Sequence, residues 1–469
     1  MLRKTKIIAT VGPATQSSEV LDALIRAGVN VFRLNMSHAS GPWCREVAGR
    51  IRERAAAQAV EVALLMDMRG PTIRTGDVAT TYDLKPGDTV EFNLSGVAPI
   101  HPINTTVNYP GLYADLKPGD TVLVDNGLLQ MKVVSCEPAR VVCTAINGGP
   151  MGSRRHINLP GVRVNLPPLT DKDFIDIDLA VDIGCDWVAM SFVRDASHIH
   201  LLRRELTSRG SSARIMAKIE DQQAVAHLEE ITGASDAVMV ARGDLGIEVH
   251  LEELPVIQRR IVSRCVHRGV PVVVATHMLE SMITNPVPTR AEVTDVANAV
   301  FEEADAIMLS GETSTGAWPV ECIDIMHRIA SRVEENDHVP SPARYSVPSN
   351  DKQRLVKAAV DLADSIAGAV LVVFTLRGVL ARYTAAFRPQ KAHAFAVCPS
   401  PAVARPLVLH RGITPFVMDF DSADRRESIT RATGYLLKKR LISSGTTMVI
   451  ISDVLDAASP MDSISVQKA

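Results

Sequence analysis

Eight short apolar runs, rich in β-branched residues, recur along the chain, and most are followed by polar residues and a segment with helical spacing. The runs cover residues 7–11, 29–34, 63–67, 187–191, 215–218, 238–240, 272–275 and 306–309. Runs without apolar–polar alternation are typical of strands buried on both faces, as in parallel sheets. Five of the helical segments are residues 18–27, 196–209, 254–268, 290–304 and 318–335. Eight strand–helix units predict an α/β fold built on a closed (β/α)8 TIM barrel.

The third and fourth runs are separated by about 120 residues, which is too long for one crossover connection. Residues 71–169 carry short alternating strands and turn signals, which predict an inserted all-β domain. The turn signals are residues 85–88, 117–120, 126–127 and 147–149. Two copies of Leu-Lys-Pro-Gly-Asp-Thr-Val are each expected to turn a hairpin. The barrel then comprises residues 1–70 and 170–338.

A segment rich in Pro and Ser, residues 339–349, is typical of a linker. Beyond it we expect an open C-terminal α/β domain over residues 350–469. Its predicted elements are a helix at 353–367, strands at 369–375, 394–397 and 414–417, and a final strand at 446–452.

Composition excludes several classes of protein. The 50 basic and 53 acidic residues give a net charge of −3, so no general nucleic-acid footprint is present. The 7 cysteines are scattered without a Cys-x-x-Cys pair, which argues against a disulfide framework or a zinc site and favours a reducing cytoplasm. The longest apolar stretches, such as residues 367–376, are too short to span a membrane.

The carboxyl ends of the barrel strands hold the working residues of such folds, and here they are polar. These ends are residues 33–38, 67–70, 191–192, 218–220, 241–246, 276–277 and 310–312, with Arg74 shortly after the third strand. We expect all of them to point into one pocket. Any one of them taken alone is more often a surface or salt-bridge residue, but so many compatible groups together favour a site. Met216, Met239 and Met308 are interpreted as core residues.

The charges among these ends indicate their chemistry. Glu220 and Asp244, on neighbouring strands, offer two oxygen ligands of the kind that Mg²⁺ prefers. Lys218 lies two residues before Glu220, so both side chains are on the same side of the strand. A lysine beside a metal site suits stabilisation of a transferring phosphoryl group.

Other groups fit an anionic substrate. Arg33 and Arg74 carry guanidinium groups suited to phosphate oxygens. Gly243 and Asp244 could present backbone N–H groups to a small carboxylate. His38 fits a substrate contact or a structural role equally well. Together these residues predict a site for an anionic substrate, a divalent metal and phosphoryl transfer.

The order and wording of these motifs in the sequence resemble those of the pyruvate kinase family. The resemblance covers nearly the whole chain, is strongest over residues 1–330, and keeps the family's order of motifs. The segments that carry it are residues 4–13, 33–38, 70–76, 190–194, 217–220, 239–246, 288–299 and 308–313.

The resemblance implies transfer of the phosphoryl group of phosphoenolpyruvate to ADP, giving pyruvate and ATP. Lys218, Arg33 and Thr276 would be catalytic, and Glu220 and Asp244 would hold Mg²⁺ or Mn²⁺. The substrate-binding set would be Arg33, Lys218, Gly243, Asp244, Thr276, Ser191 and Phe192. The nucleotide-binding set would be Arg74, His38, Asn35 and Lys172. The inserted domain would be a mobile lid that excludes water.

A potassium site is also implied, formed by side chains of Asn35, Ser37 and Asp67 and the backbone carbonyl of Met68. Thr72 departs from the family there, since potassium-dependent members carry Glu and independent members carry Lys at this position. We interpret the intact oxygen set as favouring potassium binding.

Two milder departures lie elsewhere in the catalytic part, where Asn126 replaces an Asp at the lid tip and His277 replaces a Gln. The C-terminal domain departs most. Thr375, Gly378 and Arg382 keep part of a phosphate loop that binds sugar effectors in family members, but Leu380 takes the hydroxyl position. Residues 457–463 stand where a glycine- and threonine-rich loop is usual. An effector site and a purely structural domain therefore remain alternatives.

Two other functions compete with the kinase. One is a metal-dependent lyase or aldolase acting on pyruvate-like acids, which needs neither Lys218 nor a nucleotide lid. The other is a non-catalytic descendant, which predicts loss of Arg33, Lys218, Glu220 or Asp244, and all four are present. The resemblance also implies a homotetramer in which the segment around Arg290 meets a neighbouring subunit.

Overall fold

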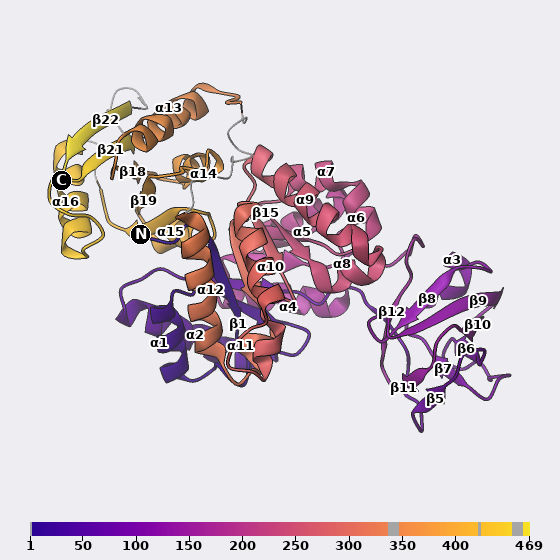
Figure 1. Ribbon diagram of the computed structural model, residues 1–469. Helices are drawn as coiled ribbons and strands as arrows, with labels where there is room; N and C mark the ends of the chain where they lie inside the picture. Colours follow the sequence, from indigo (N-terminus) through magenta and orange to yellow (C-terminus); the bar gives the residue numbers. More distant parts are fainter. Residues whose placement is uncertain (1, 336–346, 421–423, 453–462) are drawn as a thin grey trace.

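The computed structural model describes residues 2–335, 347–420, 424–452 and 463–469. Most of the predicted linker, residues 339–346, and residues 457–462 of the altered loop lie outside the described residues. Figure 1 shows three regions, with the central barrel between the inserted β domain and the C-terminal domain. The inserted domain is joined to the barrel through the chain on either side of it.

The centre of the molecule is a closed barrel of eight parallel strands in the order β1-β17-β16-β15-β14-β13-β3-β2. This confirms the predicted (β/α)8 barrel. The strands are β1 (Lys6–Thr10), β2 (Val31–Asn35), β3 (Ala63–Asp67), β13 (Trp187–Met190), β14 (Arg214–Ile219), β15 (Ala237–Ala241), β16 (Val272–Ala275) and β17 (Ala306–Leu309). Every residue of six of them is buried, and β2 and β14 each contain partly exposed residues, in line with runs without alternation. Met216, Met239 and Met308 lie in the apolar interior, as predicted.

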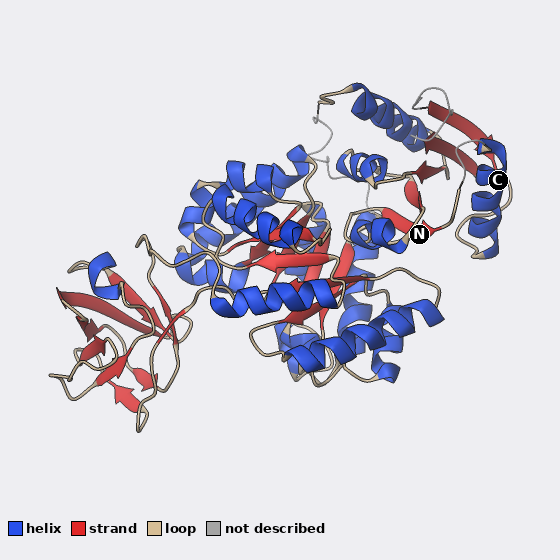
Figure 2. Cartoon of the chain, turned by 180° about the vertical axis from the view of Figure 1, so that it is seen from behind, coloured by secondary structure: helices blue, strands red, loops and turns tan. Residues whose placement is uncertain are grey.

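Helices surround this barrel, as Figure 2 shows. They are α1 (Ser18–Ala27), α2 (Gly41–Ala57), α4 (Asp171–Asp182), α5 (Ala196–Ser208), α6 (Gln222–Ala226), α7 (Leu228–Ala234), α8 (Arg242–Glu248), α9 (Leu254–Arg268), α10 (Arg290–Phe301), α11 (Gly311–Ser314) and α12 (Pro319–Glu334). Local signals set several ends. Ser17 accepts the Val20 N–H at the start of α1, and Gly28 ends it in a left-handed conformation. Thr289 and Glu292 form a capping box on α10.

The inserted domain is built on a seven-stranded sheet in the order β4-β12-β8-β9-β10-β6-β7, with a separate pair β11-β5. Its strands are β4 (Ile73–Arg74), β5 (Tyr82–Leu84), β6 (Thr89–Asn93), β7 (Asn104–Thr106), β8 (Thr121–Val124), β9 (Leu129–Glu137), β10 (Arg140–Ala145), β11 (Gly149–Met151) and β12 (His156–Asn158). One helical turn, α3 (Leu112–Asp115), interrupts the β structure.

The two Lys-Pro-Gly-Asp turns do not form hairpins, so that prediction is wrong. β5 pairs with β11 rather than with β6, and the segment before β8 is the helical turn α3. In both copies the aspartate carboxylate accepts a hydrogen bond from the backbone N–H of the lysine three residues earlier. The distances are 2.7 Å from Lys85 to Asp88 and 2.9 Å from Lys117 to Asp120. The same local motif thus starts a strand whose partner is decided elsewhere.

The C-terminal domain has a five-stranded sheet in the order β20-β19-β18-β21-β22. Its elements are α13 (Asp351–Ser365), β18 (Val370–Phe374), α14 (Val379–Ala386), β19 (His393–Cys398), α15 (Pro401–Leu407), β20 (Ile413–Val417), α16 (Arg425–Lys438), β21 (Thr447–Ser452) and β22 (Ser463–Lys468). The sequence analysis missed β22, an antiparallel edge strand whose residues are partly or fully exposed. β21 is therefore not the final strand.

The C-terminal domain closes the base of the barrel. Val408 and Leu409 belong to the same apolar cluster as the residues inside the barrel. Nearby, Arg388 donates two hydrogen bonds to Asp305, at 2.8 and 2.6 Å, and both side chains are buried. The mouth at the opposite ends of the strands is therefore left for the site. Within the described residues, each helix is too short or too polar to span a membrane.

Candidate active site

Lys218 stands at the centre of the barrel mouth. Its Nζ lies 2.7 Å from Ser191 Oγ, 2.7 Å from Glu220 Oε1 and 3.3 Å from Asp67 Oδ1. Burial disfavours the charged ammonium, but the two carboxylates outweigh this and raise the pKa of Lys218 above its usual value. The lysine is therefore fully charged at neutral pH, as a group that stabilises a phosphoryl group must be.

Arg33 lies on the other side of Asp67. Its Nε donates to Asp67 Oδ2 at 2.7 Å, and its Nη1 donates to Thr10 Oγ1 at 2.9 Å. Burial would raise the pKa of Asp67, but Lys218 and Arg33 hold it below its usual value. Asp67 is therefore a fixed anion that orients both cations, and Nη2 of Arg33 has no hydrogen bond to a described residue.

Glu220 is 1% exposed. Its Oε2 accepts the Phe192 N–H at 2.7 Å, whereas Oε1 contacts Lys218 without the geometry of a hydrogen bond. Burial raises the pKa of Glu220 to about 7, against the opposing effect of Lys218, and the negative charge of Asp244 contributes to the increase. An added cation between the two carboxylates would therefore be electrostatically favoured.

The donor set fits a divalent cation. Three carboxylates, Asp67, Glu220 and Asp244, face the two cations Arg33 and Lys218, so these groups carry a net charge of −1 (two positive minus three negative). Among the described residues, no three histidine, cysteine or acidic side chains form a ready-made metal cage. Two carboxylates with room for substrate oxygens and water are what Mg²⁺ commonly takes.

Thr276 is held in an unusual backbone conformation, with φ of 68°. A β-branched residue rarely adopts a positive φ, so its surroundings must enforce it. Its Oγ1 accepts the Gly243 N–H at 2.8 Å. Its carbonyl accepts hydrogen bonds from Nε and Nη2 of Arg242, at 3.2 and 2.5 Å. Arg242 in turn pairs with Asp295 at 2.7 Å.

Sequence reasoning missed this role of Arg242. The residue directly follows strand β15, so it belonged to the polar ends, but nothing in its neighbours indicates a bond to a carbonyl 34 residues away. The Gly243 N–H, expected to face substrate, is already bonded to Thr276.

The residues expected to bind nucleotide lie around the rim. Arg74, at the base of the inserted domain, donates to the Arg154 carbonyl at 3.1 Å and is influenced electrostatically by Asp244. His38 is exposed in the turn after β2. Lys172 pairs with Asp176 at 2.6 Å near the start of α4. Arg74 on the inserted domain and Lys172 on the barrel therefore both carry positive charge.

The expected potassium ligands lie together. Asn35 and Asp67 are partners in the register of strands β2 and β3. Asn35 Oδ1 accepts the Ser37 N–H at 3.2 Å, and the Met68 carbonyl accepts a hydrogen bond from Ser191 Oγ at 2.7 Å. The oxygens of Asp67 contact Arg33 and Lys218. Thr72 Oγ1 accepts from Arg69 at 3.4 Å.

One strand end, at Glu312, does not contribute as expected. Glu312, after the eighth barrel strand, is buried and accepts backbone N–H groups of Leu279 and Ser310, at 3.2 and 2.7 Å. It therefore fixes two loops instead of pointing into the pocket. His277 is exposed and lies 3.4 Å from Glu280. The expectation of one pocket lined by all these ends is wrong for Glu312 and stays a prediction for His277.

The altered phosphate loop lies far along the chain in the C-terminal domain. Thr375 is buried, and its Oγ1 has no hydrogen-bond partner among the described residues. Gly378 precedes α14 with φ of 77°, a conformation that glycine adopts freely. Arg382 lies close enough to lower the pKa of Arg214, after the larger effect of burial. Thr375 directly follows β18, Gly378 caps the start of α14, and Arg382 lies in its first turn.

Ser191 connects the charged centre to the strand β3 end, since it accepts from Lys218 and donates to the Met68 carbonyl. We expect Ser191→Ala to lower kcat roughly tenfold, because a hydrogen bond to a charged group that orients it is lost. Steady-state kinetics with phosphoenolpyruvate and ADP measure this. Ser208→Ala, on the exposed end of α5, serves as the matched control and should leave kcat unchanged. Equal kcat in wild type and Ser191→Ala would contradict the orienting role.

The fold and the barrel mouth together define a class of protein. It is a TIM-barrel enzyme whose centre combines two cationic side chains with three carboxylates, which fits a divalent metal and an anionic, phosphorylated substrate. Comparison with known proteins identifies the family. Residues 2–323 match the family model described as pyruvate kinase, barrel domain, and residues 353–466 match the one described as pyruvate kinase, alpha/beta domain. The chain belongs to the pyruvate kinase family.

Relatives support this over most of their length. The chain is 35% identical to a pyruvate kinase of Clostridium acetobutylicum, over 97% of this chain and 96% of that one. It is 38% identical to a pyruvate kinase of Geobacillus stearothermophilus, over 97% of this chain and 78% of that one. The crystal structure of a pyruvate kinase from Cryptosporidium parvum is similar with a TM-score of 0.93 at 33% identity, covering 99% of this chain and 96% of that one.

Proposed function

We propose that this protein is an active pyruvate kinase, which transfers the phosphoryl group of phosphoenolpyruvate to ADP. The single observation that carries the proposal is the constellation of Lys218 with Glu220, Asp67 and Arg33 at the barrel mouth. The bond between phosphorus and the enolate oxygen breaks, and a new bond forms to an ADP phosphate oxygen. The three-carbon enolate left behind takes a proton on carbon to give pyruvate.

The chain's own residues divide the work. Lys218 and Arg33 bind the phosphoryl group from two sides and stabilise charge that spreads over its oxygens during transfer. Glu220 and Asp244 would hold Mg²⁺ or Mn²⁺, which supplies positive charge beside the phosphate when bound. Thr276, fixed by Arg242, lies next to Gly243 and would face the carbon that is protonated. Ser191 and Phe192 complete the substrate pocket.

The nucleotide is assigned to the rim. Arg74 and Lys172 offer positive charge to its phosphates, and His38 and Asn35 offer hydrogen bonds. Arg74 belongs to the inserted domain, so movement of that domain as a lid would carry it toward or away from the nucleotide. A closed lid excludes water, and transfer to ADP then competes better against hydrolysis.

We propose potassium as the second cofactor, held by Asn35, Ser37, Asp67 and the Met68 carbonyl. We expect turnover with Mg²⁺ to rise at least roughly tenfold when potassium replaces tetramethylammonium, because a cation at these oxygens adds positive charge beside the phosphoryl group. Pyruvate release, measured side by side in the two salts, tests this.

The same measurement separates the alternatives. Equal turnover in both salts would reject the potassium requirement and keep the kinase. Absence of turnover in both, from folded protein, would reject the kinase in favour of the lyase or the non-catalytic descendant.

We also propose an oligomeric state, a cellular compartment and a role for the C-terminal domain. A homotetramer is supported by exposed apolar residues near the start of α10, Val287 at 66% and Val293 at 37% exposure, beside Arg290. A cytoplasmic location is supported by the 7 cysteines, all of them unpaired. The C-terminal domain is proposed as an interface and stability domain, with Thr375, Gly378 and Arg382 as the candidate effector contacts.

A further inference from the structure

A cavity of about 240 Å³ lies where the inserted domain joins the barrel, and we call it the hinge cavity. Pro71 and Ile73, on the chain entering the inserted domain, line one part of it. Residues 156–166, on the chain leaving that domain, line another. Helix α6 and the end of α8 supply the barrel side. Phe192 of the proposed substrate pocket lines part of it, whereas the charged residues Arg33, Lys218, Glu220 and Asp244 do not, so the cavity adjoins the active site without containing its charged groups.

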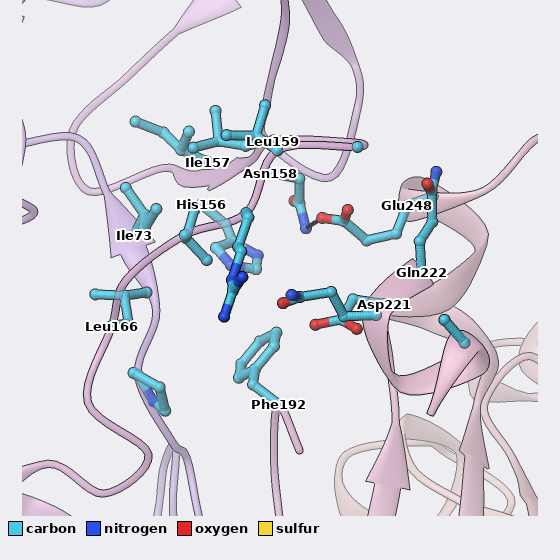
Figure 3. A pocket seen from close by; sticks show the side chains of 17 residues that line it. Ile73, His156, Ile157, Asn158, Leu159, Leu166, Phe192, Asp221, Gln222 and Glu248 are labelled. Atoms are coloured by element: carbon cyan, nitrogen blue, oxygen red, sulfur yellow. Dashed lines mark hydrogen bonds between the residues drawn. The ribbon is translucent and has the colours of Figure 1, made fainter. Parts of the chain in front are cut away.

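The polar side of the hinge cavity has an unused acceptor. Asn158 is 4% exposed and donates from Nδ2 to Glu248 Oε1 at 2.9 Å, but its Oδ1 has no hydrogen-bond partner among the described residues. A buried polar atom without a partner is costly and rare, and a ligand that donates a hydrogen bond would relieve that cost. Figure 3 shows Asn158 and Glu248 meeting at one side of the cavity, with Asp221 nearby.

This side carries the two carboxyl groups of Glu248 and Asp221, and Asp221 is influenced electrostatically by Arg194 and His227. Neither Glu248 nor Asp221 forms an ion pair within the described residues. Burial raises the pKa of Glu248 to about 7, and the charges of Asp221 and Asp244 add to this increase although Asn158 opposes it. The guanidinium group of Arg194 donates hydrogen bonds to the backbone carbonyls of Val164 and Leu166.

Arg163 lines the cavity, whereas Arg194 does not, and the Arg163 side chain is exposed and has no ion pair to a described residue. The opposite wall is apolar. Ile73 and Leu166 lie across from the carboxylates in Figure 3, and the ring of Phe192 forms one end. An acceptor-rich, negative side that faces an apolar wall matches a ligand with a cationic donor at one end and a hydrocarbon body at the other.

We propose that the hinge cavity binds a small ligand that joins a primary ammonium group to an apolar body. The ammonium would donate to Asn158 Oδ1 and to the carboxylate of Glu248, while the body packs between Ile73, Leu166 and Phe192. Because both connecting segments line the cavity, such a ligand would contact the inserted domain and the barrel at once.

Benzylamine is the probe, and benzyl alcohol and benzoate are its neutral and anionic counterparts. We expect benzylamine to bind the full chain at least about tenfold more tightly than either counterpart in isothermal titration at pH 7, because only it donates a charge-assisted hydrogen bond. Equal affinity for the three compounds, or no binding of benzylamine at millimolar concentration, would overturn the proposal.

Three variants locate the binding. Glu248→Gln removes the charge, keeps an acceptor for Asn158, and should weaken benzylamine roughly tenfold. Glu252→Gln makes the same change on an exposed residue outside the cavity and should have no effect. Ala226→Phe adds bulk at an exposed position that lines the cavity, so the chain should fold while binding is lost. Unchanged binding in Ala226→Phe and Glu248→Gln would place the amine elsewhere and refute the hinge site.

Discussion

Replacing Lys218 with methionine should lower kcat by roughly three orders of magnitude or more, because preorganised charge at the transferring group is the main device of such catalysis. Methionine keeps the length of the side chain but cannot neutralise the phosphoryl oxygens. The lysine also compensates Glu220 and Asp67, so we expect the variant to be less stable as well. Coupled assay of pyruvate release, with circular dichroism to verify folding, measures both effects.

The matched control is Lys85→Met, which removes an exposed lysine from the inserted domain. It should keep wild-type kcat. Near wild-type turnover in folded Lys218→Met would remove Lys218 from the mechanism. If Lys218→Met unfolds, the Lys218→Arg variant replaces it in the test. Arginine keeps the charge but not the compact geometry of the ammonium group, so this variant should fold while kcat stays at least roughly 100-fold reduced.

Replacing Arg388 with methionine should destabilise the chain by about 3–5 kcal/mol, because it leaves a buried carboxylate without its partner. Arg388 donates two hydrogen bonds to Asp305 between the C-terminal domain and the barrel base, at 2.8 and 2.6 Å. Asp305 also accepts the N–H groups of Val272 and Arg411, both at 3.0 Å. Urea unfolding followed by tryptophan fluorescence measures the loss, since Trp187 lies in the apolar cluster at the barrel interior.

The contribution of the Arg388–Asp305 ion pair to the free energy of unfolding should decrease in acid. Burial would raise the pKa of Asp305, but Arg388 more than offsets this and the folded pKa lies below the usual value. The ion pair therefore stabilises the fold above the ordinary aspartate pKa of about 3.9, and the contribution is lost as pH falls below it. Arg388→Met should lack this part of the acid dependence.

Two further variants test the assignment to the buried pair. Arg332→Met removes an arginine that is 82% exposed and lies 3.4 Å from Glu335, and should change the free energy of unfolding by less than about 1 kcal/mol. The double variant Arg388→Met with Asp305→Asn should recover part of the lost stability, because the buried charge is removed with its partner. A loss in Arg388→Met no larger than in Arg332→Met would contradict the role of the buried pair.

Much of the fold and site could be predicted because the signals are local. Apolar runs without alternation specify strands buried on both faces, and eight of them separated by helices close into one barrel. That topology then places Arg33, Asp67, Lys218, Glu220 and Asp244 at the same mouth, since each lies in the carboxyl-terminal part of a barrel strand or within a few residues after it. Their association required no knowledge of contacts, only the direction in which parallel strands run.

Other features depended on contacts between residues far apart in the chain. The two Lys-Pro-Gly-Asp turns have the same internal hydrogen bond, yet the strand partners on either side are set by the rest of the sheet. Glu312 resembled a site residue by position, but its carboxylate is used by the backbone of Leu279 and Ser310. A partner of this kind cannot be read from the neighbours of a residue.

The sequence by itself determined the barrel, the inserted and C-terminal domains, and the charged centre, because periodicity and strand direction fix them. The tertiary structure alone decided that Arg242 holds Thr276 in its positive-φ conformation, that Val408 and Leu409 close the barrel base, and that Asn158 and Glu248 meet at the hinge cavity. The physical reason is that burial and hydrogen-bond pairing depend on groups that only folding brings together. The residues next to a group in the sequence do not determine which distant residue it contacts.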